Sequence, residues 1–262
     1  MLVQRVASAA VGIPAIVLLN WAGGPLYTAA ACLIVFVAAY EFQSSQRGRW
    51  TPLGLLAMGL AATLPAGAMV GLDWVVWFTL GGVLIPLVWV TVRGDPVTAL
   101  TDWSWAVAGI AYVGLLGAHL VLLRELTEGR DWVYLAVFGT FAVDTAAYFV
   151  GRTVGRRKLA PHISPGKTVE GTLGGLAGGF AAVVLLNYFL GIRLEAALIV
   201  PLAALVPVAA VLGDLAESIL KRSMRVKEAG YLLPGHGGLL DRLDSLLFTF
   251  PVVYYFVTWV VP

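Results

Sequence analysis

The feature that most constrains this chain is a series of long, continuous apolar runs. About nine can be marked, at residues 6–22, 25–41, 52–71, 74–92, 103–123, 132–150, 171–190, 196–216 and 244–261. Each is close to the roughly 20 residues that a helix needs to cross a bilayer, and the runs lack the alternation of membrane β-strands. Only 12% of the residues are charged, against about 25% in soluble domains. We therefore predict an all-α, polytopic integral membrane protein with about nine transmembrane helices.

The distribution of positive charge predicts the orientation of these helices. With a cytoplasmic N-terminus, all of the 17 Lys and Arg residues except Arg124, Arg130 and Arg193 lie on the cytoplasmic side, as the positive-inside rule requires. The two long polar loops, 151–170 and 217–243, are then both cytoplasmic. We expect the first apolar run to be retained rather than cleaved as a signal peptide, because further spans follow at once.

The residues that can carry chemistry are concentrated in the second half of the chain. Residues 1–130 contain spans and short loops, and we interpret them as an N-terminal transmembrane scaffold of about five helices. Residues 131–262 are predicted to form a C-terminal catalytic region of about four helices with two basic cytoplasmic loops. Within this region, Gly171, Gly175 and Gly179 recur at four-residue spacing, which predicts close packing against a neighbouring helix.

Three acidic clusters lie at or near the cytoplasmic ends of the sixth, eighth and ninth runs. They are Asp144 with Tyr148 and Arg152, then Asp214, Glu217, Ser218, Lys221 and Arg222, and finally Asp241, Asp244 and Ser245. In each cluster the spacing places the polar side chains on one helix face. A single cluster could simply anchor a helix end through an acid–base pair, but three on one side favour a functional site. Carboxylates with few histidines favour hard cations such as Mg²⁺.

The basic loops supply candidate contacts for phosphate. Lys167 follows a Pro-Gly turn and has the hydroxyls of Ser164 and Thr168 beside it, an arrangement that suits a phosphate. Other Lys and Arg residues of these loops could instead contact lipid headgroups.

A glycine-rich stretch precedes the last apolar run. Pro234, Gly235, Gly237 and Gly238 leave backbone N–H groups uncovered and able to approach a polyanion. His236 and Arg242 add donors or charge, although His236 could instead order the loop by hydrogen bonding. Acidic clusters, basic loops and bare backbone at a membrane surface together indicate phosphoryl or nucleotidyl transfer to a lipid.

These motifs resemble those of the phosphatidate cytidylyltransferases, also called CDP-diacylglycerol synthases. The first matching set comprises Ser218, Leu220, Lys221, Arg222, Lys227, Gly230, Leu233, Pro234, His236, Gly237, Gly238, Leu239, Asp241, Arg242, Leu243 and Asp244. The second comprises Asp144, Ala147, Tyr148, Gly151, Arg152, Gly155, Ser164, Pro165, Lys167, Thr168, Glu170, Gly171, Gly213, Asp214, Glu217 and Ser218. The first half of the chain matches only in its pattern of spans. One departure is Glu228, where the family usually has Asp, and we do not expect Glu228 to bind a metal.

The resemblance implies a metal-dependent nucleotidyltransferase of phospholipid biosynthesis. Such an enzyme converts CTP and phosphatidate to CDP-diacylglycerol and pyrophosphate, with Mg²⁺ and K⁺ at a two-cation site. The resemblance further implies a homodimer in the bacterial inner membrane, with the active site on the cytoplasmic side and no nucleic-acid partner. A phosphate monoester is largely ionised at pH 7, so the main obstacle is repulsion between the two substrates rather than activation of the nucleophile.

Residue roles follow from the matched positions. We assign Asp214 and Asp241 as the principal metal ligands, with Glu217, Asp144 and Asp244 as further ligands or supports. The predicted catalytic residues are Asp214, Asp241, Lys167 and His236. Substrate contacts are predicted for Ser164, Lys167, Thr168, Arg152, Lys221, Arg222, Gly237, Gly238 and Arg242.

Two other functions use similar residues. A CTP-dependent lipid kinase would need many of the same charges but would transfer the terminal phosphoryl group of CTP. An anion or lipid transporter could use the same intramembrane carboxylates without any chemical step.

Overall fold

The computed structural model describes residues 2–45, 51–230 and 237–261, with side chains described from Gly12 onward. Within this part of the chain, eight helices are long and apolar enough to cross a bilayer. They coincide with the second to ninth predicted spans, and the first span lies in the additional helix α1 (Leu2–Ala22). The predicted all-α, polytopic membrane fold is therefore confirmed.

The helices form two compact units. The first unit comprises Met1–Glu125 and Val226–Arg242, and the second comprises Leu126–Arg225 and Leu243–Pro262. The chain thus passes between the units three times, after residues 125, 225 and 242, and the segment Val226–Arg242 belongs with the N-terminal helices. The roles predicted for residues 1–130 and 131–262, scaffold and catalytic region, stay predictions.

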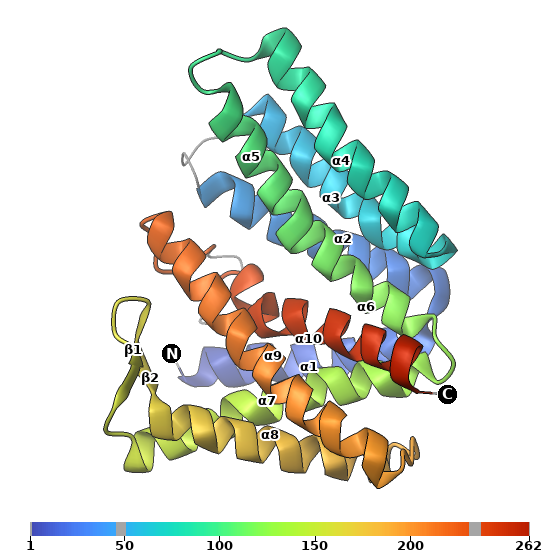
Figure 1. Cartoon of the computed structure of the whole chain (residues 1–262), viewed down its shortest axis with the longest axis vertical. Helices are drawn as coiled ribbons and strands as arrows, with labels where there is room; N and C mark the ends of the chain where they lie inside the picture. The colour runs from blue at the N-terminus through green and yellow to red at the C-terminus, as the bar shows by residue number, and fades with distance from the viewer. Residues whose placement is uncertain (1, 46–50, 231–236, 262) are drawn as a thin grey trace. The chain divides into compact units, whose positions relative to one another are not determined.

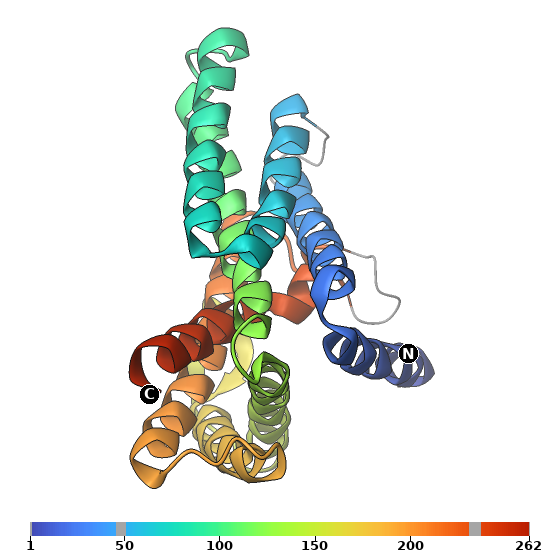
Figure 2. The ribbon, with the colours of Figure 1, turned by 90° about the vertical axis from the view of Figure 1, so that its right-hand side faces the viewer.

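The first unit is built around α3. It contains α1, α2 (Gly24–Ser45), α3 (Pro52–Val70), α4 (Leu72–Arg93), and a continuous helix made of α5 (Ala99–Gly109), the π-helical turn η1 (Ile110–Leu115) and α6 (Leu116–Arg124). Helix α3 packs against α2, α4, η1 and α6 (Figures 1 and 2). At Gly114, an added Cβ would lie 2.9 Å from the Cα atom of Ala61. The small residues therefore allow the backbones to approach closely, because van der Waals packing drives helix association in lipid.

The second unit contains three long helices, a hairpin and most of a fourth helix. These are α7 (Gly129–Val154), β1 (Lys158–Ala160), β2 (Ser164–Thr168), α8 (Val169–Phe189), α9 (Ala196–Ser223) and α10 (Leu240–Val260). Helices α7 and α8 lie side by side, and α9 packs on both (Figure 1). An added Cβ at Gly175 would lie 2.9 Å from the Cβ of Ala147 and 3.0 Å from the carbonyl oxygen of Val143. The predicted close packing of the glycine stripe is confirmed.

The segment predicted as a polar loop at 151–170 contains the β-hairpin. Strands β1 and β2 are antiparallel, with Lys158 opposite Thr168 and Ala160 opposite Ser164. Its strands of three and five residues lack the alternation of apolar and polar residues that identifies a strand in sequence. The hairpin extends from the paired ends of α7 and α8 (Figure 1), so it presents Ser164, Lys167 and Thr168 from an ordered scaffold rather than from an irregular loop.

Candidate functional site

An ion pair joins the hairpin of the second unit to α9. The Nζ atom of Lys167 contacts Oδ2 of Asp214, and the two side chains are 24% and 31% exposed. A second link lies further along α9, where Nε of Arg222 donates a hydrogen bond to the carbonyl oxygen of Ile163 at 3.1 Å. The hairpin therefore holds Lys167 against the acidic face of α9, and the predicted residues Lys167 and Asp214 are direct neighbours.

A close approach of α9 and α10 brings further carboxylates to the same place. A Cβ at Gly213 would lie 2.6 Å from the carbonyl oxygen of Asp244, so glycine is required for this contact. Asp244 interacts electrostatically with Asp214, with Asp144 of α7, and with Lys221. The second unit therefore brings Asp214 and Asp144, two of the five predicted metal ligands, within electrostatic range of a third, Asp244, and the three belong to three different helices.

The remaining acidic residue of α9 has a different environment. Oε2 of Glu217 contacts Nζ of Lys221 one turn later in the same helix. The Glu217 side chain is only 2% exposed, and that of Lys221 is 15% exposed. The charge of Glu217 is already matched by Lys221 inside the protein, so Glu217 is suited to orient the Lys221 side chain. The side chains of Lys167 and Asp214 are more exposed than those of this pair.

Other predicted substrate contacts already take part in local structure. Thr168 is the N-cap of α8, and its hydroxyl accepts a hydrogen bond from the Gly171 amide at 3.1 Å. Such a cap satisfies one of the unpaired amides at a helix start. Arg152 is exposed and donates a hydrogen bond to the Tyr148 hydroxyl at 2.8 Å. Their predicted roles in binding substrate stay predictions.

The donor set of the second unit can be compared with the needs of a hard cation. Among the described residues, no group of three His, Cys, Asp or Glu side chains is arranged to hold a metal ion by itself. Mg²⁺ bound with a nucleotide, however, takes only one or two protein carboxylates, since phosphate oxygens and water supply the other ligands. Asp214 and Asp244 fit this requirement.

In the first unit, Asp241 closes a turn of backbone at the start of α10. Its Oδ2 atom accepts hydrogen bonds from the Ala229 amide at 3.0 Å and the Gly238 amide at 2.9 Å. Gly237 has a φ of 80°, a conformation that glycine adopts without strain. Gly237 and Gly238, the described glycines of this stretch, therefore serve the turn that holds Asp241. Arg242 is exposed, and the predicted catalytic residue His236 lies outside the described residues.

A buried carboxylate that was absent from the predicted site contacts the same turn. Glu41 of α2 is 2% exposed, and its two oxygens accept hydrogen bonds from the amides of Leu239 at 3.0 Å and Leu240 at 2.8 Å. The available signal was a lone carboxylate at the end of the apolar run 25–41, because such residues are costly in a membrane and usually functional.

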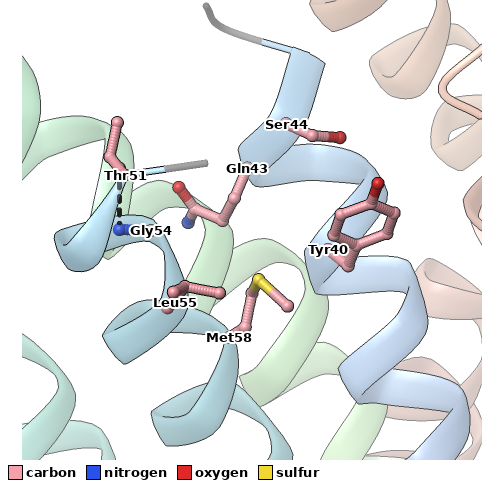
Figure 3. Close-up of a pocket in the computed structure, with 7 residues that line it drawn as sticks. All are labelled: Tyr40, Gln43, Ser44, Thr51, Gly54, Leu55 and Met58. Carbon is pink, nitrogen blue, oxygen red and sulfur yellow. Dashed lines mark hydrogen bonds between the residues drawn. The ribbon is translucent and has the colours of Figure 1, made fainter. Parts of the chain in front are cut away.

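A small pocket of the first unit has a different character (Figure 3). It lies between the end of α2 and the start of α3, where the Thr51 hydroxyl accepts a hydrogen bond from the Gly54 amide at 3.0 Å. Its lining residues are Tyr40, Gln43, Ser44, Thr51, Gly54, Leu55 and Met58. This uncharged lining does not suit a nucleoside triphosphate, unlike the Lys167–Asp214 region.

Comparison with known proteins gives a match over nearly the whole chain. The sequence model of the cytidylyltransferase family matches residues 3–260. The chain is 32% identical to the phosphatidate cytidylyltransferase of Synechocystis sp., over 99% of this chain and 97% of that protein. It is 34% identical to the protein of the same name from Brucella suis, over 91% of this chain and 86% of that protein. The Bacillus subtilis protein of this name is 42% identical over 55% of this chain and 54% of its own length.

Proposed function

The chain belongs to the cytidylyltransferase family, and we propose that it transfers the cytidylyl group of CTP to phosphatidate. A phosphate oxygen of phosphatidate forms a bond to the α-phosphorus of CTP. The bond from that phosphorus to the oxygen that bridges to the β-phosphate breaks, so that pyrophosphate leaves and CDP-diacylglycerol remains in the membrane. The resemblance of residues 144–171 and 213–244 to this family supports the same activity.

The structural observation that carries this proposal is the contact between Lys167 and Asp214. It joins a cation and a carboxylate on two elements, β2 and α9, in a region to which α7 and α10 contribute further carboxylates. Both substrates are polyanions at neutral pH, so positive groups must lower their mutual repulsion before the phosphate oxygen can reach the α-phosphorus. Lys167 is placed for this, because its ammonium group contacts Asp214 in the region to which α7 and α10 contribute carboxylates.

Each basic residue has a separate proposed task. Lys167 leaves Asp214 for a phosphate oxygen of bound CTP, since phosphate presents several charge-assisted acceptors. Lys221, held by Glu217, neutralises negative charge either on the departing pyrophosphate or on the attacking phosphate of phosphatidate. Arg222 keeps the hairpin against α9 through Ile163 and thereby maintains the position of Lys167. Arg152, Arg242 and His236 are proposed as further phosphate contacts on the family resemblance.

We also propose that the reaction depends on metal ions. Mg²⁺, when bound, neutralises charge on the triphosphate and on the departing pyrophosphate. Asp214 and Asp244 would hold it, with Asp144 as a support, and the family resemblance adds Asp241 as a ligand and K⁺ as a second cation. The homodimer, the inner membrane and a cytoplasmic active site are proposed on the same basis, together with the excess of Lys and Arg on one side of the predicted topology.

The test is to supply purified protein with phosphatidate and CTP that carries ³²P at the α-position. The lipid product should become labelled and pyrophosphate should be released in equal amount. Label that reaches the lipid only from γ-labelled CTP would establish the kinase instead. Lipid or anion flux across vesicles without release of pyrophosphate would establish the transporter.

A further inference from the structure

We propose that Glu41 of α2 is a positioning residue that fixes the orientation of the Asp241 carboxylate. It does so by holding the turn Gly237–Leu240, from which α10 begins. The part of this inference that concerns Asp241 in the reaction rests on the proposed function, whereas the part that concerns the turn rests on contacts within the first unit alone.

Three consecutive backbone amides of this turn are divided between two carboxylates. The Gly238 amide donates to Asp241 at 2.9 Å, and the amides of Leu239 and Leu240 donate to Glu41 at 3.0 and 2.8 Å. Asp241 also accepts from the Ala229 amide at 3.0 Å through the same Oδ2 atom. Because one oxygen of Asp241 is held by two amides, the plane of its carboxylate depends on where the turn places those amides.

Two glycines shape the space that Glu41 occupies. A Cβ at Gly230 would lie 2.3 Å from Oε1 of Glu41, and one at Gly238 would lie 2.6 Å from Oε2. Both glycines belong to the stretch that carries the family resemblance. The bare backbone at Gly238, first interpreted as a polyanion contact, therefore also admits a buried carboxylate. Glu41 therefore lies against Gly230 as well as against the turn Gly237–Leu240.

The two acceptor oxygens of Glu41 are important as well as its size. Both of its oxygens accept from amides at the start of α10, where the partial positive charge of the helix terminus favours an anion. Asp241 accepts from the neighbouring Gly238 amide of the same turn, so the two carboxylates share adjacent backbone donors. A glutamine at position 41 would replace one acceptor oxygen by an NH₂ donor. That donor cannot accept a hydrogen bond from the second backbone N–H group.

The experiment compares Glu41→Gln, Glu41→Asp, Gly230→Ala and Gly238→Ala in the full chain. Hydrogen exchange of the Leu239 and Leu240 amides should become at least tenfold faster in Glu41→Gln, while exchange in α7 and α8 stays unchanged. The kcat for formation of labelled lipid from CTP should fall at least tenfold. The KM for phosphatidate should stay within about twofold of wild type. Glu41→Asp keeps both acceptors on a shorter side chain and should be intermediate. Gly230→Ala displaces Glu41 without altering it and should lower kcat in the same way. Gly238→Ala places a methyl group against both Glu41 and the backbone nitrogen of Gly230 and should also lower kcat.

Two matched variants of the first unit serve as controls. Asp73→Asn removes an exposed carboxylate, and Gly59→Ala adds a methyl group where no atom lies within 4 Å. Both should keep exchange and kcat near wild type. If Glu41→Gln leaves exchange and kcat within twofold of wild type, or if the controls lose as much activity, the proposal is wrong. If Glu41→Gln does not fold, amide exchange and kcat of Gly230→Ala and Gly238→Ala test the proposal by the same criteria. A wild-type protein that forms no labelled lipid contradicts the proposed function, and the exchange data still test the turn.

Discussion

Two lysines of the second unit pair with carboxylates: Lys167 in a partly exposed pair and Lys221 in a buried one. We therefore expect removal of the first pair to affect mainly activity and removal of the second to affect mainly stability. Replacing the partly exposed Lys167 by Met should lower kcat/KM by about 10- to 100-fold. The reason is that a charge-assisted contact to phosphate contributes about 1.5–3 kcal/mol. The melting temperature should change less than after loss of the buried Glu217–Lys221 pair, since both side chains of the Lys167–Asp214 pair are partly exposed and exposed ion pairs contribute only about 0–1 kcal/mol. Lys158→Met on the exposed strand β1 is the control, and equal losses in both variants would contradict the role of Lys167.

The buried pair should behave in the opposite way. Glu217→Gln leaves Lys221 without its charged partner in a region where Glu217 is 2% exposed. We expect the free energy of unfolding to fall by about 3–5 kcal/mol, which corresponds to roughly 6–20 °C in melting temperature. Asp214→Asn, whose carboxylate is 31% exposed, should instead lose activity with little change in melting temperature. Thermal unfolding of both variants in the same detergent measures the difference, and equal melting temperatures would argue against distinct roles.

At the scale of elements, the contribution of close helix packing to stability can be tested most directly. Gly175→Ala would place a methyl group 2.9 Å from Ala147 of α7, and such overpacking costs about 1–3 kcal/mol. Gly59→Ala has open space around it and should be neutral or slightly stabilising, because alanine favours helix. Melting temperatures should therefore fall for Gly175→Ala and not for Gly59→Ala. A neutral Gly175→Ala would mean that α7 and α8 can separate at low cost.

The hairpin is the second element whose position matters. Arg222→Met removes the hydrogen bond to Ile163 and should increase amide exchange of β1 and β2 several-fold, since that tether to α9 is lost. The KM for CTP should rise, because Lys167 is then held less firmly beside Asp214. Arg130→Met, which removes an exposed arginine paired with Asp131, is a control for loss of charge. Unchanged exchange in Arg222→Met would show that the hairpin is held by other contacts.

At the scale of the whole molecule, the orientation in the membrane is open to a direct test. Helix α8 has 21 residues and is thus about 31 Å long, close to the roughly 30 Å of the hydrocarbon core. The hairpin lies at one end of it and the turn with Arg193 at the other. With Cys32→Ser removing the single cysteine, Arg193→Cys should react with an impermeant maleimide in intact cells. Lys158→Cys should react only after permeabilisation, and the reverse pattern would invert the topology.

Part of the fold and of the candidate site could be predicted from the sequence, as particular residues show. The spans followed from apolar runs, and the packing of α7 on α8 followed from the spacing of Gly171, Gly175 and Gly179. The neighbours Lys167 and Asp214 were each predicted for the site, but their direct contact was not. Glu41 was missed because its partner Leu239 lies 198 residues away, and local patterns contain no information on a pairing at that separation. The hairpin was missed because its strands are too short to show a pattern.

The sequence by itself determined that this chain is a bundle of membrane helices, because a backbone in lipid must satisfy its hydrogen bonds within each helix, and apolar length alone selects such segments. It also determined which residue types could neutralise polyanionic substrates. Only the tertiary structure decided which of these charges meet. Their pairing depends on the rotation of each helix about its axis and on close contacts such as Gly213 with Asp244 and Gly238 with Glu41, which are set by packing of the chain as a whole.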